Sequence, residues 1–484
     1  MGGSGRPPTR QAKGATPPSH SPGHRSGRPG QAVAPLDNGI RAVRGTMEGV
    51  TTRRLALAAL LLVAASTPAV SAPPVAHREV LPNGIVLLVA ERPTVPIVVV
   101  RVALRAGSAF DPANRDGLAN LAGSLLTRGT AKRTGPQLDA AIESVGGSLE
   151  ASAGREDVTA SLAALKRDVG LGLDLLAEVV LSPAFPEDEV KRRIARIQAA
   201  IKRNEADPEA VAGRELARVV FPGHPYGRPI EGTSESVGRL TRDDVVAFYR
   251  ERVRPDTAVI AVVGAVTVDE ARREIVARFG AWPRPATPPG VIPQAVPAAP
   301  PQSETIRKDV TQTTILLGRQ AIRQTDPDYF ALTVATRILG GGQAARLYRR
   351  VRDEAGLAYS VYAYLSPARA GASLVVGAQT RNAETARVLD LVRVEMERIG
   401  RERVTDEELA SAKEYLIGSY GLRLDTSSKF AGYIVALEQN ALGFDYPERY
   451  KREIGRVTAA DVQRVATKFL GPGAFDQVVV GGAP

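Results

Sequence analysis

A repeated segment constrains what this chain can fold into. Residues 239–264 begin Arg-Leu-Thr-Arg-Asp-Asp-Val and end Ala-Val-Val-Gly; residues 456–481 begin Arg-Val-Thr-Ala-Ala-Asp-Val and end Val-Val-Val-Gly. The threonine is suited to cap a helix, and the closing apolar run suits a buried strand. The chain is therefore predicted to contain two homologous halves that end in the same way. The identical pairs, all at one spacing, are Arg239 and Arg456, Thr241 and Thr458, Asp244 and Asp461, Val245 and Val462, and Gly264 and Gly481.

Each half mixes strand and helix patterns, which indicates an α+β class with a mostly antiparallel sheet packed against helices. Between the halves, Trp282 to Pro301 is dense in proline and alanine, so we expect an extended, semi-rigid linker there. Strands are expected at 84–90, 95–104, 309–318, 358–366 and 371–379, with a hairpin over 147–165 that turns at Gly154. Helices are expected at 116–128, 134–145, 167–181, 187–204, 208–220, 241–253, 327–339 and 343–355, and then on to Leu470.

The first part of the chain has a different composition from the rest. Residues 1–46 are rich in Gly, Pro, Ser and Arg, and we expect a disordered segment or translation from an upstream start. From Met47 the pattern is that of a signal peptide over 47–72, with Arg53-Arg54 before the apolar run Leu55 to Ala65. This predicts a periplasmic or secreted protein, and an uncleaved membrane anchor is the alternative. The remaining domains are then 73–281, the linker 282–304, and 305–484.

Charge and cysteine content exclude several classes of function. Residues 1–72 carry +7 of the formal net charge of +11, so the rest carries only +4 and gives no argument for nucleic-acid binding. The chain has no cysteine, which excludes thiolate metal sites. It has four histidines, and two of them, His20 and His24, precede the predicted signal peptide.

Residues 117–130 read Gly-Leu-Ala-Asn-Leu-Ala-Gly-Ser-Leu-Leu-Thr-Arg-Gly-Thr. This frame resembles the zinc-site helix of the pitrilysin-type (M16, inverzincin) metallopeptidases, in which the helix carries His-x-x-Glu-His. Here the two histidine positions hold Asn120 and Ser124, and the glutamate position holds Gly123. Asn and Ser are not normal zinc ligands, and a glycine cannot act as a general base. The resemblance implies a third ligand on a downstream helix, 187–204, and its position falls at about Ala200, or at Ile201 after a one-residue slip; neither side chain can bind zinc.

The second half keeps the other signature of that family. The run Val-Arg-Asp-Glu-Ala-Gly-Leu-Ala-Tyr over 351–359 is similar to the family's Arg/Tyr pair, here Arg352 and Tyr359. Gly356 is expected to end the helix that carries the arginine. The resemblance implies that this pair contacts the substrate backbone across a cavity between the halves. The alternative is a purely structural arginine and tyrosine.

Together these features predict a non-catalytic, peptide-binding subunit of an exported heterodimeric M16 zinc endopeptidase. We expect no intrinsic activity and no metal bound by this chain, with zinc held by a partner subunit that has an intact His-x-x-Glu-His motif. Peptides are the expected substrates, nucleic acid is not an expected partner, and a homodimer is left open. The rival interpretations are a structural or assembly protein and a stand-alone peptide-binding module.

Overall fold

The computed structural model describes residues 75–296 and 300–482. The predicted upstream segment and the signal peptide therefore lie outside the described residues. Among the residues that are described, no helix has the length and apolar character needed to cross a membrane.

The first half is built on a six-stranded sheet in the order β1-β2-β6-β3-β5-β4. Neighbouring strands are antiparallel except for β2 and β6, which run parallel. This confirms the mostly antiparallel sheet. The strands are β1 (His77–Val80), β2 (Val86–Glu91), β3 (Ile97–Leu104), β4 (Ser148–Ala153), β5 (Val158–Leu165) and β6 (Ala258–Gly264).

The second half repeats this plan in a five-stranded sheet with the order β7-β11-β8-β10-β9. Its only parallel pair among the described strands is β7 with β11, which corresponds to β2 with β6. The strands are β7 (Ser303–Arg307), β8 (Gln312–Ala321), β9 (Ala358–Ser366), β10 (Ala372–Arg381) and β11 (Asp476–Gly481).

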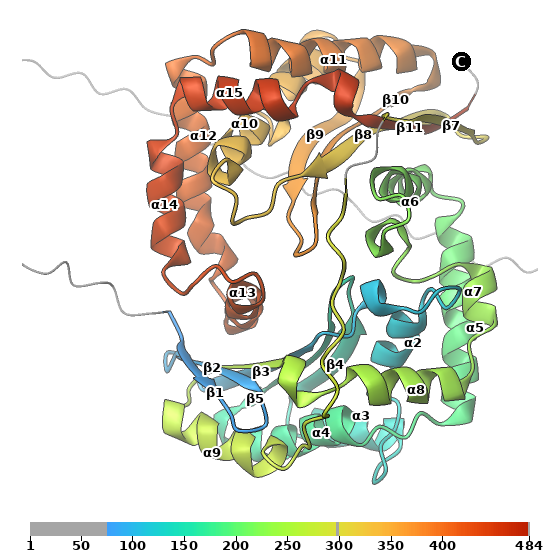
Figure 1. The fold of residues 1–484 in the computed structure, drawn as a ribbon, viewed down its shortest axis with the longest axis vertical. Helices are drawn as coiled ribbons and strands as arrows, with labels where there is room; N and C mark the ends of the chain where they lie inside the picture. The colour runs from blue at the N-terminus through green and yellow to red at the C-terminus, as the bar shows by residue number, and fades with distance from the viewer. Residues whose placement is uncertain (1–74, 297–299, 483–484) are drawn as a thin grey trace, which may run out of the picture. The chain divides into compact units, whose positions relative to one another are not determined.

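Helices cover both sheets, as the α+β prediction requires (Figure 1). In the first half these are α2 (Leu118–Leu125), α3 (Gly135–Glu143), α4 (Val169–Leu181), α5 (Glu187–Asn204), α6 (Pro208–Val220), α7 (Ser234–Gly238), α8 (Arg242–Arg252) and α9 (Val268–Phe279). In the second half they are α10 (Tyr329–Gly340), the π-helix η5 (Tyr348–Glu354), α11 (Thr385–Arg401), α12 (Asp406–Gly418), α13 (Ser427–Gln439), α14 (Tyr446–Arg456) and α15 (Ala459–Phe469).

The repeated segment folds as its sequence predicts. Thr241 caps α8 and Thr458 caps α15, and each side chain accepts a hydrogen bond from an aspartate backbone N–H three positions on. In both cases the aspartate carboxylate accepts the N–H of the threonine in return, which completes a capping box. The buried strands β6 and β11 follow these helices.

Each half contributes one helix that packs on the sheet of the other half. Helix α6 of the first half packs on β8 and β11 of the second sheet, where Leu216 and Val220 join Leu316 and Val478 in one apolar cluster. Helix α13 of the second half packs on β3 and β6 of the first sheet (Figure 1). The two helices occupy equivalent places in the repeat, so the exchange is reciprocal and ties the halves together.

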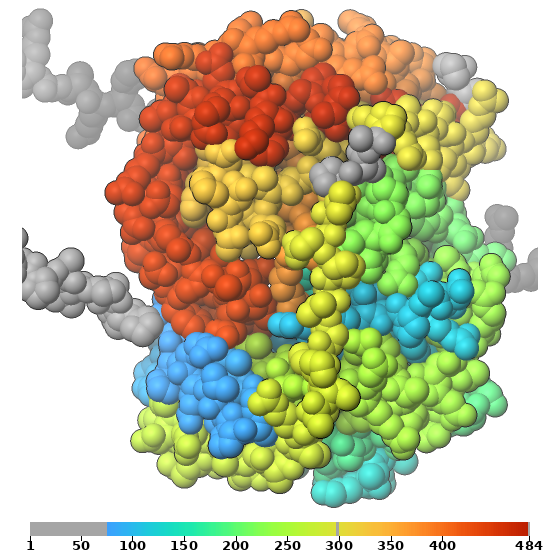
Figure 2. Space-filling view, viewed as in Figure 1, coloured from blue at the N-terminus to red at the C-terminus, as the bar shows by residue number. Residues whose placement is uncertain are grey.

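The proline-rich segment is irregular up to residue 296, and β7 begins at Ser303 within the range expected for the linker. In Figure 2 it lies along one face of the molecule as the yellow segment between the halves. Its backbone is tied down, because the Ala295 N–H donates to the Ala370 carbonyl at 2.7 Å and Gln320 Nε2 donates to the Val296 carbonyl at 2.9 Å.

Several features differ from the sequence analysis. Helices α7 and α9 were not predicted. The helix expected at 343–355 is a shorter π-helix, η5, over 348–354. The glycines at 340–342 end α10 and delay the next helix, and a π-turn is a geometry that periodicity does not reveal. The edge strands β1 and β7 were not predicted, because their alternate positions are exposed and carry polar side chains.

Candidate functional site: the degenerate zinc helix and the Arg/Tyr pair

Helix α2, at the predicted degenerate zinc motif, is well anchored in the structure. Its N-cap residue Gly117 has φ +94°, which favours glycine. The buried Asp111 carboxylate accepts the N–H of Gly117 at 2.8 Å and that of Ala119 at 2.7 Å, so it satisfies two donors that a helix start leaves free. The segment that resembles the zinc-site motif therefore still forms a helix.

The ligand positions on α2 are occupied by ordinary polar groups. Asn120 and Ser124 are half-buried, and the Ser124 hydroxyl donates to the Leu121 carbonyl at 2.9 Å within the same helix. Gly123 is buried against the edge strand β4, where an added Cβ would lie 3.1 Å from the Cβ and the N of Ala153. Ala200 lies half-buried on α5, the helix that packs beside α2.

An arginine links α5 to α2 beside the positions that the resemblance assigns to zinc ligands. Arg193 of α5 donates from Nη2 to the Ser124 carbonyl at 2.9 Å. Burial lowers the pKa of Arg193, and the neighbouring guanidinium groups of Arg128 and Arg196 lower it further. An amide, a hydroxyl and a methyl group at the ligand positions, with an arginine bonded between the helices, do not fit Zn²⁺. In the part of the chain that the structure describes, no group of three or more His, Cys, Asp or Glu could hold a metal ion.

The Arg/Tyr pair is built by the junction between η5 and β9. Gly356 follows η5 with φ +64°, and its N–H donates to the Arg352 carbonyl at 3.1 Å. The next N–H, of Leu357, donates to the Val351 carbonyl at 3.0 Å. The glycine predicted to end the helix is thus present, and it directs the chain from η5, which carries Arg352, into β9.

A β-bulge presents Tyr359. In the pairing of β9 with β10, Ser360 lies opposite Gln379 but Ala358 lies opposite Thr380, which leaves Tyr359 as an extra residue. Bulges re-aim a side chain away from the strand's alternation, and they are common next to active sites. The Tyr359 side chain is accordingly 76% exposed, although it lies between strand residues that are buried or half-buried.

Arg352 and Tyr359 contact each other. Arg352 Nη1 donates to the Tyr359 carbonyl at 2.9 Å, and the guanidinium lies 4.9 Å from the Tyr359 ring centre and 4.8 Å from that of Tyr348. The pair borders an open cavity of about 350 Å³ that Gln312, Gln379 and Arg381 also line. It offers guanidinium and phenol donors beside the free edge of β9, a combination that suits a peptide backbone.

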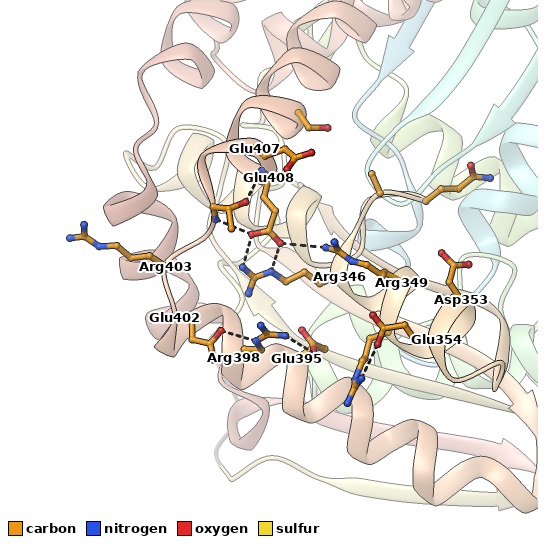
Figure 3. A pocket seen from close by; sticks show the side chains of 15 residues that line it. Arg346, Arg349, Asp353, Glu354, Glu395, Arg398, Glu402, Arg403, Glu407 and Glu408 are labelled. Carbon is orange, nitrogen blue, oxygen red and sulfur yellow. Dashed lines mark hydrogen bonds and ion pairs between the residues drawn. The ribbon is translucent and has the colours of Figure 1, made fainter.

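A second cavity, of about 670 Å³, is lined by residues of η5, α11 and α12 (Figure 3). Its arginines and carboxylates largely pair with each other: Arg346 binds Glu408 through two bonds of 2.7 Å, Arg350 binds Glu354 at 2.8 Å, and Arg398 binds Glu402 at 2.7 Å. We interpret it as an ionic network that supports η5 and α12.

Sequence analysis missed a buried network that joins the halves. Arg369, at the turn between β9 and β10, donates to Glu156 at 2.6 Å and to Asp157 at 2.8 Å, both at the turn between β4 and β5. The Tyr226 hydroxyl donates to Glu156 and accepts the Ala370 N–H at 3.0 Å. Burial raises the pKa of Asp157. No local sequence pattern could identify this network, because its members come from three distant segments.

The structure keeps the two predicted sites apart. Asn120, Gly123, Ser124 and Ala200 lie at α2 and α5 of the first half, whereas Arg352 and Tyr359 lie at η5 and β9 of the second. Within the described residues, no hydrogen bond or ion pair joins one group to the other. Within the described residues, Arg352 and Tyr359 therefore make no direct polar contact with the former ligand positions on α2 and α5.

Comparison with known proteins agrees with this architecture. Residues 86–234 match the family model described as insulinase (peptidase family M16), and residues 239–416 match the one described as peptidase M16 inactive domain. An uncharacterized zinc protease of Mycobacterium leprae is 30% identical over 404 residues, which cover 81% of this chain and 89% of that protein. One of Streptomyces coelicolor is 29% identical, covering 82% and 87% respectively.

Solved structures show the same fold. The crystal structure of a peptidase M16 inactive domain from Pseudomonas fluorescens is 28% identical, with a TM-score of 0.79 over 84% of this chain and 98% of that one. A protease from Helicobacter pylori, at 20% identity, has a TM-score of 0.76 and covers 84% of this chain and 99% of its own. The repeat, the two sheets, the matched family models and these relatives lead to one assignment: the chain belongs to the M16 peptidase family.

Proposed function

We propose that this chain is the non-catalytic, peptide-binding subunit of an exported heterodimeric M16 zinc endopeptidase. The observation that carries the proposal is the exposed Tyr359 on its bulge, bonded through its carbonyl to Arg352, in a chain whose zinc-ligand positions hold Asn120, Ser124 and Ala200. In this proposal the chain has the residues for substrate contact and lacks the residues that bind zinc.

In this proposal the partner subunit carries an intact His-x-x-Glu-His helix and supplies the zinc and the general base. Arg352 and Tyr359 hold the peptide backbone near the scissile bond. The phenol O–H can donate to a carbonyl oxygen, and the guanidinium is a permanent donor and positive charge beside it. A pure scaffold has no need of a tyrosine that is 76% exposed on a strand bulge, so substrate contact is favoured over the scaffold alternative.

Export is part of the same proposal and rests on the sequence pattern of residues 47–72. N-terminal sequencing of the mature protein should give a start between Ser66 and Pro74. A mature chain that starts at Met1 or Met47 would contradict cleavage.

The decisive experiment is reconstitution with an exported M16 subunit that has the intact motif and is encoded beside this chain. The mixture should cleave peptides far better than either subunit alone. Arg352→Ala and Tyr359→Phe should each lower kcat/KM by an amount equivalent to about 2–4 kcal/mol if the contact is made in the transition state. A contact made equally in the ground state would change mainly KM.

Matched controls separate contact from general damage. Arg350→Ala removes an arginine from the same π-helix, one that pairs with Glu354, and Tyr415→Phe removes a phenol O–H from another exposed ring. Both should keep wild-type kinetics, and co-elution should show that all four variants assemble. If Arg352→Ala and Tyr359→Phe assemble and are as active as the controls, the pair is structural and the scaffold interpretation replaces this one.

A further inference from the structure

The exchange of α6 and α13 identifies the sheet faces that look toward the opposite half. Because α13 belongs to the second half and packs on the first sheet, the face it covers is the one turned toward the second half. Helix α13 covers β3 and β6 on that face, and α6 covers β8 and β11 on the equivalent face of the second sheet. On the second sheet the apolar cluster of α6 also includes Val375 of β10 and packs against Tyr362 of β9, whereas β4 and β5 of the first sheet have no helix of the opposite half among the main element contacts of the described residues.

The uncovered part of the first sheet is polar. Its floor is a row across three strands, in which Arg101 of β3 lies opposite Ser161 of β5, and Ser161 lies opposite Glu150 of β4. Thr159, Ser148 and Ser152 share this face, because strand side chains alternate. A face meant only for packing would carry apolar residues here, as Val99 and Val263 do beneath α13.

Two arginines on this face lack a carboxylate partner. Arg101 is half-buried, and its Nη1 lies beside α13, 3.2 Å from where a Cβ on Gly432 would stand. Arg105, also half-buried, lies past the end of β3 toward the Arg369 turn. No ion pair of the described residues includes either of them. Burial lowers the pKa of both arginines, and the acid that most opposes this shift, Asp157, is already bonded to Arg369. Half-buried charges without a partner are unfavourable unless a ligand supplies one.

The face of the second sheet on which α6 packs offers hydroxyl donors. Tyr362 and Tyr364 of β9 stack with ring centres 5.9 Å apart, and the Tyr362 ring lies flat over Gly377, where a Cβ would come within 2.4 Å of it. Burial, and then Glu209, raise the pKa of Tyr362 to about 12, so its hydroxyl stays protonated at neutral pH.

We infer that the face formed by Arg101, Arg105, Ser161 and Thr159 binds acidic side chains of the peptide, so that this subunit selects anionic peptide segments. The inference rests on the proposed function, because it assumes that peptides enter between the two halves. An incoming carboxylate supplies the missing partner for Arg101 and Arg105, while Glu150 on the same face opposes it.

The test measures binding to the purified full chain by fluorescence anisotropy with three labelled peptides of equal length. The probes alternate Ala with Glu, Gln or Lys. The Glu peptide should bind most tightly and the Lys peptide least, and added salt should reduce the difference. Arg101→Gln should weaken binding of the Glu peptide by about fivefold to tenfold and leave the Gln peptide unchanged, since a charge-assisted bond is lost.

Substitutions with the opposite expected effect, and a control substitution at the surface, test whether the change in peptide binding is specific to this face. Glu150→Gln should strengthen binding of the Glu peptide, and Arg101→Lys should retain most of it. Arg167→Gln removes the same charge from a site that is 80% exposed and paired with Asp168, and it should have no effect. Circular dichroism should show that all variants are folded.

Three results would overturn the inference. Equal binding of the three peptides, or equal effects of Arg101→Gln and Arg167→Gln, would refute the charge selection and leave peptide binding intact. Absence of binding by all three peptides would refute this inference and the proposed peptide-binding function together.

Discussion

The two halves contain the same pair of elements at their edge strands, and they use it differently. In the first half α3 is a regular α-helix, Gly146 ends the turn after it, and β4 pairs with β5 without interruption. In the second half the helix is the π-helix η5, Gly356 ends it, and β9 carries a bulge at Tyr359. One extra residue in β9 and one altered helical turn thus distinguish the second hairpin, which exposes Tyr359, from the first.

The helices beside these hairpins show the opposite change. Gly123 of α2 and Gly340 of α10 occupy equivalent places in the repeat, and both lie against an alanine of an edge strand, Ala153 in one half and Ala363 in the other. The position that holds the general base in the family's active helix is thus used here as its counterpart in the second half is used, for close packing on a strand. At this position, α2 and α10 therefore pack on their edge strands in the same way.

Zinc content is the broadest test of this comparison. The purified chain should hold far less than one zinc ion per molecule and cleave no peptide alone, because its ligand positions hold an amide, a hydroxyl and a methyl group. Elemental analysis after dialysis against a weak chelator measures this. About one tightly held zinc per chain would show that the first half is still a metal site.

Substitution of the two equivalent glycines should give unequal losses of stability. In Gly340→Ala the new Cβ would lie 2.4 Å from the Ala363 backbone N, so the strand must move, at a cost of about 1–3 kcal/mol. In Gly123→Ala the closest atoms are at 3.1 Å, and the higher helix propensity of alanine offsets most of the crowding. Urea unfolding of both variants measures the difference, and equal losses would mean that the two helices do not pack alike.

The glycines after α3 and η5 provide a matched pair with a functional readout. Gly146 has φ +63° and Gly356 has φ +64°, and neither has an atom within 4 Å of an added Cβ. Each change to alanine should cost about 1 kcal/mol through backbone strain alone. Only Gly356→Ala should also lower kcat/KM of the reconstituted enzyme, because it shifts Arg352 relative to Tyr359. A kinetic loss in Gly146→Ala of the same size would assign the effect to general destabilisation.

The smallest effects are expected on the former ligand positions. Asn120→Ala and Ser124→Ala should change the free energy of unfolding by less than about 0.5 kcal/mol, since both side chains are half-buried and Ser124 bonds only within its own helix. Arg193→Ala is the contrasting variant, because it removes a bond between α5 and α2. A large loss in Asn120→Ala would reveal a role for that amide that its surroundings do not suggest.

Much of the fold could be predicted from local patterns. Helices α5 and α6 begin and end where the sequence analysis placed them, because a proline and acidic first turn start α5 and Asp207-Pro208 start α6. Strand β9 was also predicted with correct bounds. The edge strands β1 and β7 could not be, since their pairing depends on β2 and β11, which lie elsewhere in the sequence.

In the candidate site, too, some features could be predicted from the sequence and others could not. Asn120, Gly123, Ser124 and Ala200, and the pair Arg352 and Tyr359, were identified from motif frames, and their assignment to a binding role remains a prediction. The bulge at Tyr359, the unpartnered Arg101 and the network around Arg369 could not be foreseen. Each depends on which strand or turn lies opposite.

By itself, the sequence determined the repeat, the threonine caps, the glycine stop after Arg352 and the chemistry missing from α2. These depend on hydrogen bonds and periodicity within a few residues of one another. Only the tertiary structure decided which helix covers which sheet, where the register of β9 slips to expose Tyr359, and which charges are left without partners. Those properties arise from contacts between segments far apart in the chain, where sequence spacing carries no information about distance.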